Sequence, residues 1–275
     1  MRRLTISGLL AVGALLMSSL PASAAEPETG STSAAVADPC SPSAAPPAPP
    51  APACSGNGTT AAETFKWGQP NRVEEFDGPL GAAWGVYDGP GHGGNGTRTP
   101  NAVSLRDGIM TITGDSSGAT AGMAWIPGQK YGRWEARVRS PVSDPSYNSL
   151  LLLWPDEENW PVGGEIDFME ISDPARQRAD IFVHYGADNS QTQGKVDVDA
   201  TQWHNWAVEW TPDHIAAFLD GKQWYRTTDP VVQPPGPMHL CIQLDWFPDG
   251  GTPKTSTMEI AWVKQYPAGG AASGG

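Results

Sequence analysis

Three acidic residues, Glu165, Asp167 and Glu170, lie close together in this 275-residue chain. Side chains alternate between the two faces of a strand, so Glu165 and Asp167 share one face and the residues beside them point to the other. A regular strand would turn Glu170 toward that apolar face, where a charge is costly. A β-bulge near Phe168–Met169 would return Glu170 to the acidic face. We therefore expect three carboxyl groups on one side of a bulged strand.

Crowded carboxyl groups repel one another when ionised, so the pKa of at least one of them rises. A carboxyl group that stays protonated near neutral pH can act as a general acid. Two such groups about 5–5.5 Å apart cleave glycosidic bonds with retention of configuration. A concave strand would bring the carboxyl groups of Glu165 and Glu170 to that separation, so we expect this pair to carry the chemistry. The alternative is three acids on a solvated strand face.

The chain also contains twelve tryptophans. Indole rings stack on the apolar faces of sugars, although tryptophans within strands usually belong to the core. We assign Trp206 and Trp210 to the core, because they alternate with an apolar residue and share its face. Trp160 and Trp246 lie in segments rich in Gly, Pro and Asp, and they are candidates for a sugar-binding cleft. His184 follows an apolar run and either hydrogen-bonds the acids from a neighbouring strand or is structural.

The elements that must position these residues are typical of an all-β protein. Short runs rich in Val, Ile, Thr, Trp and Tyr alternate with clusters of Gly, Pro and Asp. The dipeptides Asp107-Gly108 and Asp220-Gly221 accept positive φ and predict tight hairpins. Many antiparallel strands in about 200 residues bury their apolar faces as a two-sheet sandwich or a barrel. The clearest predicted strands are Ile109–Thr113, Arg133–Arg139, Asp180–Tyr185, Trp206–Trp210 and Met258–Tyr266.

The N-terminal segment has the features of a signal peptide. Arg2 and Arg3 precede an apolar run that ends at a small-residue cleavage pattern, Ala22-Ser23-Ala24. The run is too short to span a bilayer comfortably, so we expect residues 1–24 to be removed and the protein to be secreted. A buried N-terminal helix is the alternative. The sequence leaves open whether export is general or uses the twin-arginine route.

Composition divides the rest of the chain into three parts. Residues 25–64 consist mostly of Ala, Pro, Ser, Gly and Thr, which cannot bury enough apolar area to offset chain entropy. We expect them to form a disordered linker, and residues 268–275 to form a flexible tail. Residues 65–267 are expected to form one catalytic domain.

Charge and cysteine content restrict the partners. Removal of the signal peptide would change the formal net charge from −13 to −15, which argues against nucleic acid and anionic membranes and favours neutral polymers. Simple solubility is the alternative explanation. A disulfide between Cys40 and Cys54 is compatible with export, and Cys241 is expected to be a buried thiol. The Cys and His residues show no metal-ligand spacing. We expect a monomer.

The segment from Glu165 to Glu170 resembles the Glu-x-Asp-x-x-Glu signature of glycoside hydrolase family 16, in the bulged form of laminarinase- and lichenase-like β-glucanases. Residues 131–137, 154–164 and 206–221 resemble further segments of that family in the same order, and the likeness extends over about residues 70–266. The resemblance implies a β-jelly-roll, with two antiparallel sheets packed as a sandwich and a concave carbohydrate-binding cleft.

The resemblance also implies roles for individual residues. Glu165 would be the nucleophile, Glu170 the general acid/base, and Asp167 the residue that controls the position and protonation of the nucleophile. The cleft would be lined by Glu135, Arg137, Trp160, His184 and Gln243. No cofactor is implied. A structural calcium ion occurs in relatives but is not expected here, because Ala261 replaces an Asp that often helps to bind it.

The expected function is that of a secreted, retaining endo-β-glycanase acting on β-1,3- or β-1,3/1,4-glucan. Residues 240–247 depart from the Asn-rich segment of many relatives, so a galactan substrate stays open. A transglycosylase of the same fold is a further alternative. A carbohydrate-binding protein that has lost catalysis is another alternative, although the presence of all three acids argues against such a loss. A structural wall protein would explain the Pro/Ala-rich linker but not the acid cluster.

Overall fold

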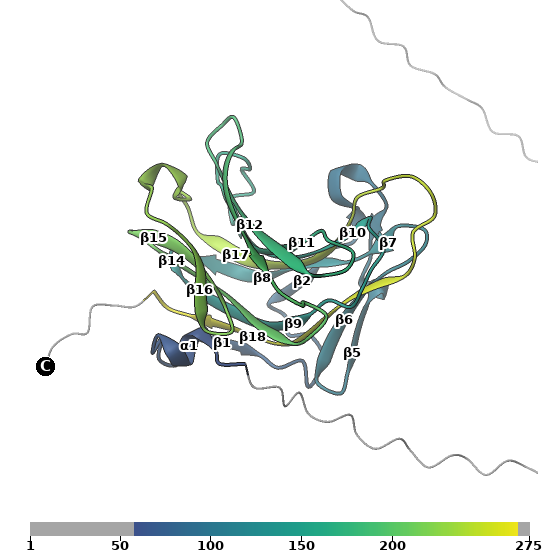
Figure 1. Ribbon diagram of the computed structural model, residues 1–275, viewed down its shortest axis with the longest axis horizontal. Helices are drawn as coiled ribbons and strands as arrows, with labels where there is room; N and C mark the ends of the chain where they lie inside the picture. The colour runs from purple at the N-terminus through teal and green to yellow at the C-terminus, as the bar shows by residue number, and fades with distance from the viewer. Residues whose placement is uncertain (1–57, 269–275) are drawn as a thin grey trace, which may run out of the picture. The chain divides into compact units, whose positions relative to one another are not determined.

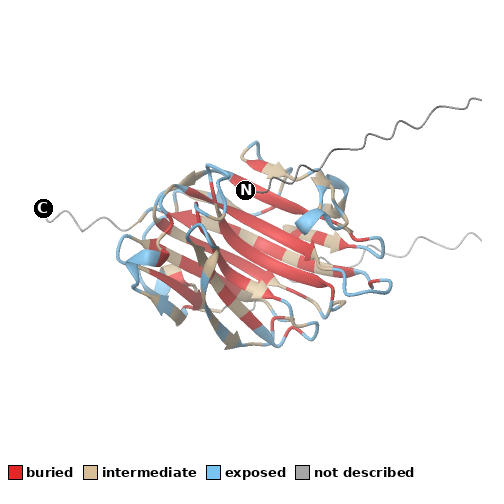
Figure 2. Cartoon of the chain, turned by 90° about the horizontal axis from the view of Figure 1, so that it is seen from above, coloured by how far each residue is buried: buried red, intermediate tan, exposed pale blue. Residues whose placement is uncertain are grey.

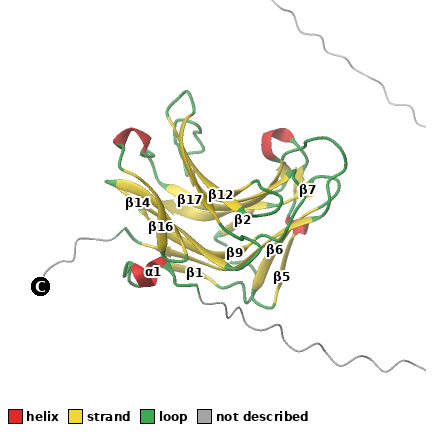
Figure 3. Ribbon diagram, in the orientation of Figure 1, coloured by secondary structure: helices red, strands yellow, loops and turns green. Residues whose placement is uncertain are grey.

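The computed structural model describes residues 58–268, and strands make up most of the regular structure there (Figure 3). The predicted signal peptide, most of the predicted linker, Cys40 and Cys54 lie outside the described residues, as does the tail after residue 268. Within them, seven strands form the sheet that carries the acids, here called the cleft sheet. In spatial order these are β13 (Ser190–Asp197), β12 (Arg178–Tyr185), β11 (Glu165–Ile171), β10 (Tyr147–Pro155), β17 (Met238–Trp246), β8 (Gly122–Gln129) and β2 (Trp84–Val86).

A second sheet, here called the outer sheet, contains eight strands of the described chain. In order they are β16 (Lys222–Thr227), β15 (His214–Leu219), β14 (His204–Thr211), β9 (Gly132–Arg139), β18 (Ser256–Tyr266), β6 (Ile109–Gly114) and β5 (Val103–Arg106), with β1 (Arg72–Glu74) paired to β18. Smaller elements are the strands β3 (Gly89–Pro90), β4 (Thr97–Arg98) and β7 (Ala119–Thr120), the helix α1 (Ala61–Thr64) and the 3-10 helices η1 (His92–Gly94), η2 (Pro100–Ala102) and η3 (Pro230–Val232).

The apolar core lies between these two antiparallel sheets, which pack face to face (Figure 1). Trp134, Trp206 and Trp210 enter it from the outer sheet, and each is at most 1 % exposed. Leu151 and Phe168 enter it from the cleft sheet. Figure 2 shows buried positions along the middle of the strands and exposed ones in the turns. The sandwich expected from the sequence is therefore confirmed, as is the assignment of Trp206 and Trp210 to the core.

The two predicted hairpin turns are also confirmed. Asp107 and Gly108 have φ of 54° and 71° between β5 and β6, and Asp220 and Gly221 have φ of 48° and 72° between β15 and β16. Positive φ at both central positions matches the right-handed twist of the flanking strands. These short connections fix the strand register at the edges of the outer sheet.

The predicted linker is wrong at its C-terminal end, because α1 is a folded part of the domain. Thr60 caps the helix, and the side chain of Ala61 is fully buried against Trp67 and Phe218. The Ala- and Thr-rich composition of this turn is the same as that of the linker before it. Contact with the outer sheet, which composition does not reveal, makes this helix part of the domain.

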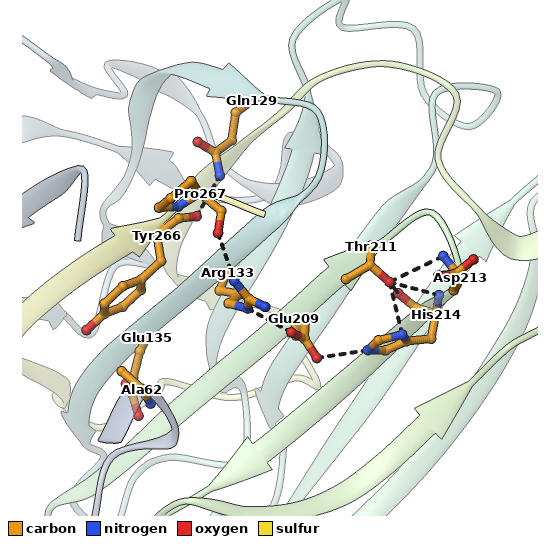
Figure 4. A network of polar contacts seen from close by, with 10 residues as sticks. All are labelled: Ala62, Gln129, Arg133, Glu135, Glu209, Thr211, Asp213, His214, Tyr266 and Pro267. Carbon is orange, nitrogen blue, oxygen red and sulfur yellow. Dashed lines mark hydrogen bonds and ion pairs between the residues drawn. The ribbon is translucent and has the colours of Figure 1, made fainter. Parts of the chain in front are cut away.

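A polar network fastens the C-terminal end of β18 to the outer sheet (Figure 4). Arg133 donates from Nε to Glu209 at 2.7 Å and from Nη1 to the carbonyl of Pro267 at 2.9 Å. The other oxygen of Glu209 lies 2.8 Å from Nε2 of His214. Because both carboxylate oxygens of the half-buried Glu209 are engaged, three strands of this sheet are held in fixed relation.

Candidate active site

Strand β11 contains the predicted bulge. In its register against β10, the pairing passes from Met169 to Asp167 and leaves Phe168 as the extra residue. Both Phe168 and Met169 are buried in the core between the sheets. The additional residue returns Glu170 to the face that carries Glu165 and Asp167, as the sequence predicts.

The three carboxyl groups line a cleft of about 870 Å³ on the face of the cleft sheet that points away from the core. β10, β11, β12 and β17 supply its floor, and the loops before β4 and β11 supply its walls. The cleft-lining residues that carry the argument below are Tyr87, His92, Arg98, Trp154, Glu158, Trp160, Glu165, Asp167, Glu170, His184, Gln243, Asp245 and Phe247.

Asp167 is the most enclosed of the three acids, at 2 % exposure. Its Oδ2 lies 3.3 Å from Nε2 of His184 on the neighbouring strand β12. Glu165 is the register partner of His184, and one polar atom from each of Glu165, Asp167 and His184 lies within 4.8 Å of the others. The predicted contact of His184 with the acid cluster is therefore present. On its other side, Nδ1 of His184 lies 2.8 Å from Oδ1 of Asn189, which fixes the ring.

The electrostatics favour retention of protons in this cluster. Burial, and next the Asp167 carboxyl, raise the pKa of Glu165 to about 9. Burial, and next the charge of Glu170, raise the pKa of Asp167 well above its usual range. Burial also raises the pKa of Glu170. At neutral pH the cluster therefore holds protons that three solvated carboxylates would have released, which is the condition that general acid catalysis requires.

The raised pKa of Glu165 gives a testable stability effect. A carboxyl whose folded pKa lies above its unfolded value of about 4.3 binds protons more tightly in the folded state, so stability falls as pH rises from about 4 toward 9. Glu165 and Asp167 retain protons as a pair, and Glu165→Gln removes one of the two carboxyl groups, so it weakens that dependence. We expect the variant to match the wild type in free energy of unfolding near pH 4 and to exceed it by about 2–4 kcal/mol at pH 8. Denaturant titrations at both pH values measure the difference, and an equal difference at both would contradict the expectation.

Glu170 receives a hydrogen bond from a residue that the sequence did not point to. Asn148 on β10 donates from Nδ2 to Oε1 of Glu170 at 3.2 Å. Beyond the end of β11, the buried Arg176 donates to the carbonyls of Ile171 at 2.6 Å and Tyr147 at 3.0 Å. These bonds hold β10 and β11 together beside Glu170. The only feature of the sequence that could have indicated a role for Asn148 is its polar side chain at the start of a largely apolar strand.

One wall of the cleft is aromatic. Trp160 is 41 % exposed, and its ring stacks on Trp154 with centroids 6.2 Å apart and planes at 12°. Trp160 acts to lower the pKa of Glu165, and its ring lies 6.3 Å from that of His184. Trp154 donates to Glu158 at 2.8 Å. The sequence prediction that Trp160 lies in the cleft is therefore confirmed, and this wall offers an indole face beside Glu165.

The β17 side of the cleft contains the predicted residue Gln243 and a group of residues that the sequence did not single out. Arg98 donates to both oxygens of Asp245, at 2.7 and 2.8 Å, and also to Gln243. The ring of His92 lies 4.5 Å from that of Phe247, centroid to centroid. Asp245 could have been found from Gln243, because residues two apart on a strand share a face.

The prediction that Trp246 lies in the cleft is wrong. Trp246 lies three residues after Gln243 on β17 and therefore points to the opposite side of the sheet, against the core. Its Nε1 donates to Oγ of Ser146 at 3.1 Å, and its ring covers Gly118 so closely that an added Cβ there would come within 2.4 Å of it. Phe247, the next residue, lines the cleft instead.

The prediction that Glu135 and Arg137 line the cleft is also wrong. Strand β9 belongs to the outer sheet, and both side chains lie on the face of that sheet that points away from the core. Glu135 accepts hydrogen bonds from the backbone N–H of Ala61 at 2.6 Å and of Ala62 at 3.3 Å. It therefore anchors α1 rather than a sugar. Arg137 donates to Asn205 at 3.0 Å. The alternation of apolar and polar residues along β9 fits a strand of either sheet. The sequence therefore could not show whether Glu135 and Arg137 face the cleft or the far side of the outer sheet.

Cys241 is buried as predicted, but on the cleft side of its sheet. Its Sγ lies 3.2 Å from the hydroxyl of Tyr87. It packs there with Ala124, Leu150 and Leu152 in a small apolar cluster separate from the main core. Burial, moderated by the Tyr87 hydroxyl, raises the pKa of this thiol to about 12, so it stays protonated at neutral pH.

Known proteins resemble this chain both in sequence and in fold. Glucan endo-1,3-beta-glucosidase A1 of Niallia circulans is 28 % identical over an alignment 165 residues long, and the match covers 50 % of this chain and 24 % of that protein. Endo-1,3-1,4-beta-glycanase ExsH of Rhizobium meliloti is 27 % identical over an alignment 192 residues long, and the match covers 62 % of this chain and 40 % of that protein. The chain thus spans well under half the length of these relatives.

Among solved structures, the laminarinase catalytic domain of Thermotoga maritima superposes with a TM-score of 0.64 at 20 % identity, covering 74 % of this chain and 99 % of that one. A β-1,3-1,4-glucanase (lichenase) derived from a mouse hindgut metagenome gives 0.61 at 22 % identity, covering 71 % and 98 %. These likenesses establish the jelly-roll fold. The model of the glycosyl hydrolases family 16 matches residues 94–264, more than half of the chain and including all three acids. The chain therefore belongs to glycosyl hydrolases family 16.

Proposed function

We propose that this protein is a secreted, retaining endo-β-glycanase that hydrolyses a neutral β-glucan, with β-1,3- or β-1,3/1,4-linkages. The observation that carries the proposal is the bulged strand β11, which brings Glu165, Asp167 and Glu170 to one face inside a cleft. The family membership supports cleavage of O-glycosyl bonds. The relatives named for 1,3- and 1,3-1,4-glucans support the choice of linkage.

The proposed first step is attack by Glu165 on the anomeric carbon while Glu170 protonates the departing oxygen. Glu165 must be ionised to attack. Asp167, which is more deeply buried and lies beside His184, is the better place for the proton that the pair retains. With that proton on Asp167, the neighbouring Trp160 and His184, which both act to lower the pKa of Glu165, stabilise its carboxylate.

In the second step Glu170, now ionised, removes a proton from water. The resulting hydroxide equivalent attacks the anomeric carbon, the bond to Glu165 breaks, and the sugar leaves with its original configuration. Asn148 holds Glu170 in place through both steps. All steps use side chains of this chain, and no metal or cofactor takes part in the proposal.

The charge of the cleft supports a neutral polymer. In the described part of the chain, five carboxyl groups line it, from Glu158, Glu165, Asp167, Glu170 and Asp245, against the single guanidinium of Arg98. A sulfated or carboxylated glycan would be repelled there. Among the galactans that the sequence leaves open, the sulfated ones are therefore less suited to this cleft than a neutral glucan.

The proposal includes secretion of the protein and a monomeric state. An insoluble or high-molecular-weight glucan lies outside the cell, which agrees with the signal-peptide pattern of residues 1–24. No helix among residues 58–268 is long and apolar enough to cross a membrane. The acidic net charge of −13 disfavours nucleic acid as a partner.

A polysaccharide panel tests the function. The full chain would be incubated with laminarin, barley mixed-linkage β-glucan, agarose and carrageenan, and reducing ends and product lengths would be measured. We expect release of short oligosaccharides from a neutral β-glucan and none from carrageenan. Products longer than the starting oligosaccharide would show transglycosylation instead. Tight binding without any release would contradict the enzymatic proposal.

A further inference from the structure

A buried ion pair closes one end of the cleft. Asp245 on β17 is 2 % exposed at its side chain, and Arg98 on β4 is 17 % exposed. Three hydrogen bonds join the Arg98 guanidinium to the Asp245 carboxylate, through Nε and Nη2. The guanidinium also lies 5.2 Å from the centroid of the Tyr87 ring. Charges this buried are poorly screened by water, so their effect extends to neighbouring groups.

The ion pair lies one strand away from the side chains that surround the proposed acid/base residue. Asp245 is the register partner of Asn148 across β10 and β17, and Asn148 donates to Glu170. Gln243, which also accepts from Arg98, pairs with Leu150, and Leu150 pairs with Glu170. Two adjacent rows of the cleft sheet thus lead from the Arg98–Asp245 pair to Glu170.

Every charged group that faces Glu170 can be identified in the described structure. Glu165 and Asp167 lie on the same strand and face, and Asp180 and His184 come from β12, where Asp180 is paired with Arg178 at 3.1 Å. Asp245 comes from β17. His92, on η1, lies 3.6 Å from Asp245 and is 51 % exposed. Arg98 is the only permanent cation lining the cleft in residues 58–268.

We propose that Arg98 is a positioning residue for the reaction at Glu170: by neutralising Asp245, it prevents a buried negative charge from acting on the acid/base carboxyl. Arg98 does not need to touch the substrate for this role. Burial is the largest cause of the raised pKa of Glu170, and the charges of Asp180 and Asp245 raise it further. An unpaired Asp245 would therefore make Glu170 release its proton less readily. The inference rests on the proposed function.

The test is the alkaline limb of the pH profile of kcat/KM, which reports the proton on the general acid of the free enzyme. For Arg98→Met, we expect this limb to move to higher pH by about 0.5–1 unit, because Asp245 is left uncompensated. For Asp245→Asn, which preserves shape, we expect a shift to lower pH of similar size, because Arg98 is left uncompensated. The double variant, with neither charge, is expected to return to within about 0.2 unit of the wild type.

A matched control is available on the outer sheet. Arg139 pairs with Glu259 at 2.7 Å, far from the cleft-lining residues, so Arg139→Met should leave the alkaline limb unchanged. Because Asp245→Asn carries its own expected shift, the test does not depend on whether Arg98→Met folds. Thermal unfolding of each variant identifies any that do not.

The possible results distinguish a failure of the proposed role of Arg98 from a failure of the proposed glucanase function. Measurements would use laminarin or barley β-glucan, whichever the wild type hydrolyses. If the wild type hydrolyses neither, the proposed function fails first. If it is active, a raised KM with an unmoved limb in Arg98→Met would make Arg98 a sugar contact and overturn the inference. Shifts of the same sign in both single variants would overturn it as well, since opposite charges must act in opposite directions.

Discussion

Glu165→Gln is expected to lower kcat on the preferred β-glucan by about 10⁴-fold or more while the protein stays folded. The amide has the shape of the carboxyl but cannot form a bond to the anomeric carbon. Asp167 cannot replace it, because Asp167 is almost fully buried behind it and is held at His184. The loss should be in kcat, with binding of the glucan retained, since the aromatic wall at Trp160 remains in place.

Two further variants make this test specific. Glu158→Gln changes another carboxyl of the same cleft, one that accepts a hydrogen bond from Trp154, and should alter kcat by less than about tenfold. Glu165→Ala opens space for azide, which should restore turnover and give a glycosyl azide of inverted configuration. A near-normal rate for Glu165→Gln, or azide products of retained configuration, would remove Glu165 from the nucleophile role.

Glu170→Gln is expected to produce the second largest effect, and one that depends on the leaving group. Hydrolysis of a polysaccharide should fall by about 10³–10⁴-fold, because a sugar alkoxide leaves poorly without a proton. A dinitrophenyl β-glycoside needs no such proton, so its first step should stay within about tenfold of the wild type. The second step then lacks its base, and the intermediate on Glu165 should accumulate as a burst of dinitrophenol.

The same variant should remove the alkaline limb of the pH profile, since that limb belongs to Glu170 in the wild type. Asn148→Ala is the companion variant: it leaves the carboxyl but removes the hydrogen bond at 3.2 Å. A smaller loss, about 10-fold, is expected, without a burst. If Glu170→Gln slows both substrates equally, the residue is not the general acid.

Much of strand β11, which carries the three acids, could be predicted from the sequence. Two-residue alternation placed Glu165 and Asp167 together, and the cost of burying Glu170 required a bulge where one is found, at Phe168. The hairpin turns followed from Asp-Gly dipeptides, whose backbone preferences are local. These features depend on neighbouring residues along the chain, so their physics is contained in short segments.

Strand periodicity also showed that Glu135 and Arg137 share a face, but not which sheet that face belongs to. Each strand of a sandwich turns one face to the core and the other away from it, and the outward face of either sheet satisfies the same pattern. Only the pairing of β9 with β14 and β18 places these residues behind the outer sheet. The anchoring of α1 by Glu135 followed from that placement and had no local signal.

The cleft walls were decided by tertiary structure alone. Arg98 on β4 and Asp245 on β17 are separated by 147 positions in the sequence and meet only in the folded protein. Their pairing is strong because both are buried, and burial is a property of the assembled sheets. The sequence by itself determined the acids, their strand and the class of fold, because these follow from local backbone geometry and patterning. The structure decided which charges surround the acids, because electrostatic partners depend on distance in space and on exclusion of water.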